Sequence, residues 1–161
     1  MICIPVTGPN MAQALEDIKK AREVADMIEL RLDLIEQFQL KSLIAASGQE
    51  VIVTYRPTRQ GGKSELSDAE RIKVLKEALA LGVKFIDVEW DAVALLNKNE
   101  LAKVIVSRHF FDEFPENLAQ IIADLNQHPA AITKVAVKIL DISQNAILFI
   151  ELQNKKKPLI L

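Results

Sequence analysis

The sequence is poor in the features that mark secreted, membrane-embedded and nucleic-acid-binding proteins. Its 161 residues include a single cysteine, Cys3, which excludes an internal disulfide and agrees with a reducing cytosol. The net charge is −2 and the isoelectric point is near 5.8, so no basic surface argues for nucleic acid. No apolar run approaches a transmembrane span, and the N-terminus lacks the basic and apolar regions of a signal peptide. These absences predict a soluble cytoplasmic protein with neither nucleic acid nor a membrane as partner.

What the sequence does contain is a regular alternation of two kinds of segment. Half of the residues are hydrophobic, enough for one compact domain over residues 1–161 with a sizeable core. Apolar runs of strand length alternate with segments of helical period, without a low-complexity stretch or linker. The predicted strands are 2–6, 27–33, 51–56, 85–90, 103–109, 132–139 and 158–161. The predicted helices are 11–25, 37–47, 68–81, 92–98, 116–126 and 143–152.

Local signals mark some of the helix ends. Ser67 and Glu70 have the spacing of a capping box at the start of the third helix. Gly48 and Gly82 follow the second and third helices, where glycine commonly ends a helix. Strand and helix in regular alternation predict parallel strands joined by crossover helices.

The length of the repeat predicts a (β/α)8 TIM barrel, here incomplete. Strands recur about every 25 residues, and the chain holds six βα units and a seventh strand, against about 250 residues for a typical barrel. The chain is therefore expected to be truncated at its C-terminus by about one and a half units. An incomplete barrel would leave strand edges exposed, which predicts disorder, aggregation or a homodimer.

Five of the predicted strands carry polar residues on one face, although a strand covered on both sides should be continuously apolar. Successive side chains of a strand point to opposite faces, so Glu29, Arg31 and Asp33 lie together. The other four strands pair Thr54 with Arg56, Asp87 with Glu89, Ser107 with His109, and Lys134 with Lys138. In a barrel the apolar faces would turn outward to the helices and the polar faces would converge inside.

The polar faces balance four cations against four carboxylates, with His109 in addition. Because an unpaired buried charge costs several kcal/mol, this balance predicts paired groups around a polar cavity. Barrel enzymes build their sites at the C-terminal ends of the strands, where many of these residues fall. Two alternatives remain: an antiparallel sheet with one solvated face, and a purely structural network of ion pairs. Helix-length connections disfavour the first, and a pattern shared by five strands disfavours the second.

The ordered motifs resemble those of one family, type I 3-dehydroquinate dehydratase of the shikimate pathway. The matching stretches are I-E-L-R-L-D (28–33), V-T-Y-R-P-T-R-Q-G-G (53–62), F-I-D-V-E (85–89), K-V-I-V-S-R-H-F-F (103–111) and I-T-K-V-A-V-K (132–138). Two of them are close to plant-type sequences, in which this domain precedes a shikimate dehydrogenase. Fusion to such a dehydrogenase in a longer chain is therefore left open.

The resemblance implies a lyase that dehydrates 3-dehydroquinate to 3-dehydroshikimate through a Schiff base, without metal or external cofactor. It assigns the imine to Lys134 and the general acid and base to His109. It assigns substrate binding to Glu29, Arg31, Arg56 and Gln60. Asp33, Asp87, Glu89, Ser107 and Lys138 are expected to support the site.

Two departures from the family pattern bear on activity. Gln60 stands where many members have a glutamate, which removes a charge near His109. The family's late arginine for the substrate carboxylate, and the serine and glutamine of its closing loop, have no counterpart in the chain. A truncated, catalytically impaired homologue is therefore one alternative, and a class I aldolase-type lyase with the same lysine chemistry is another.

The residues alone leave some roles open. Lys138 is nearer the expected mouth of the barrel than Lys134, so the choice of Lys134 depends on the resemblance. Burial and the neighbouring cations would lower the pKa of the imine-forming lysine, which must attack as a neutral amine. Arg59 and Lys63, in the long polar loop, either reach the substrate or are solvated, and His128 is expected at the surface.

Overall fold

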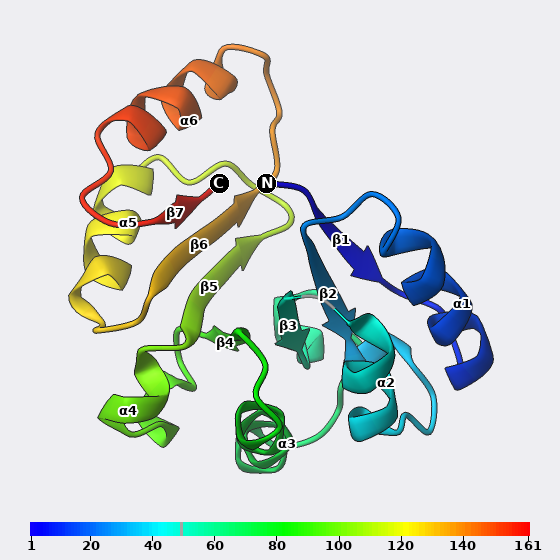
Figure 1. Cartoon of the computed structure of the whole chain (residues 1–161). Coiled ribbons are helices and arrows are strands. Elements are labelled where there is room, and N and C mark those ends of the chain that lie inside the picture. The colour runs from blue at the N-terminus through cyan, green and yellow to red at the C-terminus, as the bar shows by residue number, and fades with distance from the viewer. Residues whose placement is uncertain (49) are drawn as a thin grey trace. The chain divides into compact units, whose positions relative to one another are not determined.

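The computed structural model describes residues 1–48 and 50–161, which form two compact units, Met1–Asp87 and Val88–Leu161 (Figure 1). The five strand pairs whose register the structure describes are parallel. The predicted crossover connections are therefore confirmed, and the alternative of an antiparallel sheet is wrong. Within the described residues, no helix combines the length and the apolar character needed to cross a membrane.

The first unit repeats strand and helix three times and ends in a fourth strand. Its strands are β1 (Cys3–Val6), β2 (Met27–Arg31), β3 (Glu50–Thr54) and the beginning of β4 (Phe85–Glu89). Its helices are α1 (Met11–Ala21), α2 (Leu40–Ser47) and α3 (Asp68–Ala80), with 3₁₀ turns η1 (Leu32–Leu34) and η2 (Thr58–Gln60). The strands pair in chain order, and Ile28 lies level with Ile4 and Val51.

The core of the first unit lies between the apolar faces of these strands and the helices. Ile28, Leu30 and Val53 are fully buried on the strands, as Leu43 and Leu75 are on the helices. Burial of such side chains contributes roughly 1.5–3 kcal/mol each relative to exposure.

The helix-end signals predicted at Ser67, Gly48 and Gly82 are confirmed, although the second helix begins at Leu40 and not at residue 37. Both hydrogen bonds of the Ser67–Glu70 capping box are present at the start of α3. Gly48 and Gly82 have φ angles of 55° and 89°, the left-handed region that favours glycine at a helix C-terminus.

The second unit carries the remaining repeats. Its strands are the end of β4, β5 (Val104–Phe110), β6 (Ile132–Val137) and β7 (Leu159–Ile160). Its helices are α4 (Lys98–Leu101), α5 (Leu118–Gln127) and α6 (Gln144–Gln153), with a 3₁₀ turn η3 (Val93–Leu95). The β5–β6 register runs from Ile105–Ile132 to Phe110–Val137. Thr133 of β6 donates a hydrogen bond of 2.7 Å to the Asn126 side chain of α5, so this face of β6 is the helix-covered one.

Several predicted boundaries were wrong. The helix expected over 92–98 is the short turn η3 and then α4, because the Asn97 side chain accepts hydrogen bonds from the first helical N–H groups and starts a new helix. The strand expected over 132–139 ends at Val137, level with the last residue of β5, Phe110. Lys138 therefore lies outside the strand and is exposed.

Other boundaries differ by a few residues. The strand expected over 27–33 ends at Arg31, because the chain tightens into η1 there. That over 51–56 runs from Glu50 to Thr54, so Arg56 follows β3. The helix expected over 11–25 ends at Ala21.

Helix α6 is apolar, yet none of its residues is buried. Phe149 is 66% exposed, Ile150 53% and Ile147 43%. Contiguous exposed apolar surface of this kind marks an interaction or aggregation site. The disorder, aggregation or dimerisation expected through the strand edges stays a prediction. The exposed apolar side chains of α6 are a second surface that would favour association.

Replacing Phe149 by Glu and Ile150 by Lys tests the exposure of α6. Because neither side chain is buried, each substitution is expected to change the free energy of unfolding by at most about 0.5 kcal/mol. Binding of a hydrophobic dye and light scattering should both decrease. Leu125→Ala on α5, where the side chain is buried, is the control and should cost about 2–5 kcal/mol in chemical denaturation. Comparable losses for the two kinds of variant would contradict the exposed placement of α6.

Candidate functional site

The predicted polar residues of the first unit are joined to one another at the ends of its strands. The Thr54 hydroxyl of β3 donates a hydrogen bond of 2.6 Å to the Glu29 carboxylate of β2. Their strand positions are diagonal, since Thr54 lies level with Arg31 and with Asp87 of β4. Glu29 and Arg31 are half-buried, so the polar face of β2 is partly open to water.

Asp33 connects the end of β2 to the loop that follows β3. Arg31 donates to both of its oxygens, from Nε to Oδ1 at 2.9 Å and from Nη2 to Oδ2 at 2.7 Å. The backbone N–H groups of Arg56 and Lys63 donate to the same carboxylate at 3.3 and 3.2 Å. The hydrogen bond to Asp33 is the largest cause that raises the pKa of the Arg31 guanidinium above its ordinary value. The sequence predicted Asp33 within the strand, whereas it lies in η1 and accepts hydrogen bonds from Arg31 and from the loop after β3.

Arg56 and Asp87 form a buried ion pair. Arg56 Nη2 lies 2.9 Å from Asp87 Oδ1, and the two side chains are 4% and 0% exposed. A buried pair of this kind is strongly destabilised when one partner is removed, because the other charge is left without compensation. Arg56 is thus positioned by a carboxylate of the neighbouring strand, although it lies two residues beyond β3.

Gln60 lies in the loop after β3, at the end of the turn η2. It is half-buried, and its side-chain amide donates to the Arg59 carbonyl at 3.4 Å. The following Gly61 has φ 75°, in the left-handed region. A Cβ on Gly62 would lie 2.1 Å from the Arg56 carbonyl oxygen, so the second glycine is required by close backbone approach. The adjacent glycines therefore fix the path of the chain around Gln60.

In the second unit, Lys134 and His109 lie on adjoining strands and face the same way. Lys134 pairs with Ser107, and His109 lies two residues further along β5. The spacing of parallel strands puts the Cα atoms of Lys134 and His109 about 8 Å apart, within reach of a lysine side chain. Thr133 and Val135, which flank Lys134, are fully buried, and Thr133 bonds to α5. Lys134 therefore points away from α5, and it is half-buried.

The His109 ring is stacked on that of Phe111, with centroids 5.8 Å apart and planes at 8°. His109 is half-buried, and Ser107, on the same face of β5, is fully buried. Glu89, the last residue of β4, is fully buried. Arg108 points to the opposite face, with its guanidinium carbon 4.8 Å from the Trp90 ring centroid and 4.9 Å from that of Phe110.

The structure thus describes two sets of predicted residues, one in each unit. The first contains Glu29, Arg31, Asp33, Arg56, Gln60 and Asp87, and the second contains Glu89, Ser107, His109 and Lys134. Lys138, expected on the inner face of its strand, belongs to neither set because the strand ends before it. Among the described residues, no cluster of three or more His, Cys, Asp or Glu side chains could hold a metal ion.

Three contacts were not predicted from the sequence. These are the stacking of Phe111 on His109, the contact of Arg108 with two aromatic rings, and the pairing of Asp68 with two arginines. Asp68 and Arg71 have the three-residue spacing of helical neighbours, so that pair could have been found from the sequence. The other contacts join residues whose proximity depends on tertiary structure.

Asp87→Asn tests the buried pair with Arg56. The substitution keeps the shape of the side chain but removes the carboxylate charge that pairs with the buried guanidinium, so it should cost about 3 kcal/mol in chemical denaturation. Glu50→Gln removes a carboxylate that pairs with Lys84 at an exposed position and should cost less than about 1 kcal/mol. Equal effects of the two variants would show that the Arg56–Asp87 pair is not shielded from water.

Comparisons with known proteins identify one family. The family model of type I 3-dehydroquinase matches residues 2–161. The bifunctional 3-dehydroquinate dehydratase/shikimate dehydrogenase of Arabidopsis thaliana is 35% identical over 92% of this chain and 27% of its own. A 3-dehydroquinate dehydratase of Methanococcus maripaludis is 35% identical over 72% of this chain and 56% of its own. The chain thus spans about a quarter and about half of these two relatives.

Solved structures give the same fold. A type I 3-dehydroquinate dehydratase of Clostridium difficile superposes with a TM-score of 0.83 at 22% identity, covering 99% of this chain and 73% of its own. A 3-dehydroquinate dehydratase of Aquifex aeolicus gives 0.79 at 26% identity, covering 99% and 77%. The fold class is therefore an incomplete (β/α)8 barrel, as the sequence predicted. The chain belongs to the type I 3-dehydroquinase family.

Proposed function

We propose that the protein dehydrates 3-dehydroquinate to 3-dehydroshikimate through a Schiff base on Lys134, with His109 as general acid and base. The observation that carries this proposal is the placement of Lys134 and His109 on one face of the adjoining strands β5 and β6. Family membership and the names of the relatives support the reaction. The relative from Arabidopsis thaliana supports fusion to a shikimate dehydrogenase in a longer chain.

The reaction needs an electron sink next to the carbon that loses a proton. The neutral Lys134 amine attacks the C3 ketone, and loss of water forms a protonated imine. His109 then takes a proton from C2, and the electron pair left behind is delocalised into the imine. A proton from His109 accompanies the departing hydroxyl, and hydrolysis of the imine releases the product and the free lysine. The protonated imine is itself the electron sink, so the proposed route uses neither metal nor external cofactor.

Substrate binding is proposed for Glu29, Arg31, Arg56 and Gln60, whose neighbours hold their side chains. Arg31 is fixed by Asp33 and Arg56 by Asp87, while Glu29 accepts the Thr54 hydroxyl. Side chains held in this way lose little freedom when a substrate binds, which favours affinity. Asp33, Asp87, Glu89 and Ser107 are proposed as supporting residues.

The placement of the two lysines supports Lys134 over Lys138. Lys134 is half-buried and lies level with the fully buried Ser107. Lys138 follows the end of β6 and is exposed. A lysine that must react as a neutral amine benefits from a desolvated position, because burial disfavours the charged form. An exposed lysine lacks this advantage.

Borohydride reduction in the presence of 3-dehydroquinate tests the proposed intermediate. Reduction should leave a stable adduct on the peptide that contains Lys134, detected by mass spectrometry. Lys134→Ala should abolish the adduct and lower kcat by at least about 10³-fold, whereas Lys138→Ala should leave both within about threefold.

The other outcomes separate the alternatives. An adduct on Lys138 would overturn the choice of lysine. The absence of any adduct would support a catalytically impaired homologue. Cleavage of a carbon–carbon bond without dehydration would support an aldolase.

Phe111→Leu tests whether the stacked ring orients His109. The resonances of the His109 imidazole should shift in an NMR spectrum, while those of His128, after α5, should not move. The value of kcat should fall about tenfold with little change in KM, since a general base must be held in line with the proton it takes. Phe111→Tyr keeps an aromatic ring and should restore both. If the imidazole resonances stay in place, Phe111 has no orienting role.

A further inference from the structure

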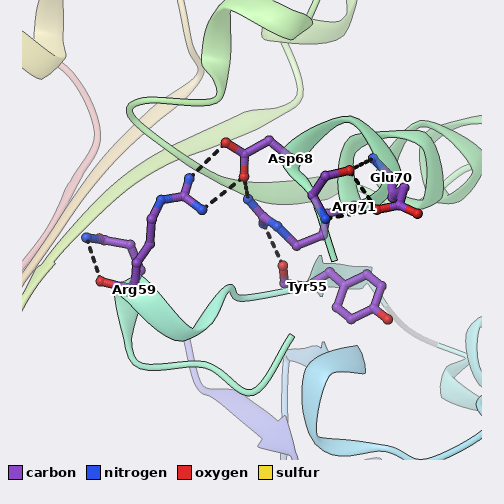
Figure 2. A network of polar contacts seen from close by, with 7 residues as sticks. Tyr55, Arg59, Asp68, Glu70 and Arg71 are labelled. Atoms are coloured by element: carbon purple, nitrogen blue, oxygen red, sulfur yellow. Dashed lines mark hydrogen bonds and ion pairs between the residues drawn. The ribbon is translucent and has the colours of Figure 1, made fainter. Parts of the chain in front are cut away.

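Asp68, the first residue of α3, and Arg71 of the same helix link the loop after β3 to the end of that strand (Figure 2). Arg59 of the turn η2 donates to both carboxylate oxygens of Asp68, from Nη1 to Oδ1 at 3.0 Å and from Nη2 to Oδ2 at 3.1 Å. Arg71, one turn further along α3, approaches Oδ1 from Nη2 at 2.5 Å. Arg71 also donates from Nη1 to the Tyr55 carbonyl at 2.7 Å, just beyond the end of β3.

Arg71 makes this arrangement rigid because its side chain is fully buried. A buried guanidinium needs a carboxylate nearby, so Arg71 and Asp68 hold each other in place. The Tyr55 carbonyl then ties both to the end of β3. The Asp68 carboxylate is thus held in place independently of Arg59. Formation of the Arg59–Asp68 pair therefore costs less side-chain entropy than an exposed ion pair normally does. Although burial acts in the opposite direction, the two guanidinium groups hold the pKa of Asp68 below its ordinary value.

The loop that Arg59 belongs to also carries Gln60. The side-chain amide of Gln60 donates to the Arg59 carbonyl, so the two residues are linked through the backbone and through this bond. Asp33 holds the loop elsewhere, at the backbone N–H groups of Arg56 and Lys63. Arg59 lies between Arg56 and Lys63, and its side chain attaches this part of the loop to α3.

We propose that Arg59 and Asp68 form a latch that positions Gln60 for the substrate, with Asp68 acting through Arg59 rather than by contact with the substrate. The proposal has two parts. The first part, that the pair holds the loop in place, concerns the protein without substrate. The second part, that this positions Gln60 for the substrate, rests on the proposed function. Arg59 lies in one of the matching stretches but was assigned no role, and Asp68 lies in none of them.

The hold on the loop can be measured by hydrogen exchange of its backbone amides. Gly61 and Gly62 donate to the carbonyls of Thr58 and Pro57, and these bonds break when the loop opens. Arg59→Met keeps the stem of the side chain and leaves the Arg71–Asp68 pair intact. It should speed exchange of the two glycine amides about fivefold, with no change in the midpoint of global unfolding.

A double-mutant cycle separates the latch from a general loosening. Asp68→Asn should also speed exchange, and the double variant should be no faster than Asp68→Asn alone, because the pair is already broken. Glu50→Gln, which removes the carboxylate of the exposed pair with Lys84, is the control and should leave the two glycine amides unchanged. Additive effects of Arg59→Met and Asp68→Asn, or no effect of Arg59→Met, would overturn the latch.

Substrate kinetics test the second part of the proposal. Arg59→Met should raise KM for 3-dehydroquinate about fivefold and change kcat less than twofold, since a positioning defect acts on binding. In a Gln60→Ala background the same substitution should have less than a twofold effect, because Gln60 is no longer there to be positioned. An undiminished effect in that background would show that Arg59 does not act through Gln60. If borohydride trapping yields no adduct, the proposed function fails, and the exchange cycle still decides whether the pair holds the loop.

Discussion

The requirement that every buried charge has a partner determines the arrangement of both the strands and the loop after β3. Arg56, just beyond β3, pairs with Asp87 of β4, and Arg71 pairs with Asp68 within one helix. A buried charge without a partner costs several kcal/mol, whereas a buried pair is often no more stabilising than apolar residues of the same size. Such pairs are thus poor means of adding stability but effective means of fixing where a guanidinium lies. That is what a site for a polar substrate needs.

Asp33 and Asp68 each combine an arginine contact with a hold on the same loop. Asp33 binds Arg31 and two backbone N–H groups of the loop, and Asp68 binds Arg71 and the Arg59 side chain. The loop is thereby attached to the ends of two different elements, η1 and α3. The two attachments differ in kind. Asp33 accepts hydrogen bonds from backbone N–H groups, which do not depend on the side chain at those positions, whereas Asp68 requires an arginine at position 59. The side-chain attachment is therefore the one that a single substitution can remove.

The parts of the structure that the sequence predicted are those that a local rule determines. The alternation that placed Glu29 with Arg31 follows from the two-residue period of a strand, and the start of α3 follows from Ser67 and Glu70. The position of Lys138 was missed because β6 ends level with the end of β5, which depends on pairing with a neighbour. Burial of Arg71 and stacking of Phe111 depend on tertiary contacts that no local pattern records.

The end of β6 also supports the proposed choice between the two lysines whose roles the sequence left open. The two lysines are four residues apart, and side chains of a strand alternate between its faces with a period of two. A strand extended to residue 139 would therefore have placed both on one face, with Lys138 nearer the strand's C-terminal end. Because the strand stops at Val137, only Lys134 is held by neighbours, between the buried Thr133 and Val135 and level with Ser107. An amine that must lose its proton and then form a bond in a fixed direction requires both partial desolvation and a defined orientation. Strand pairing supplies the orientation and burial the desolvation, and Lys138 has neither.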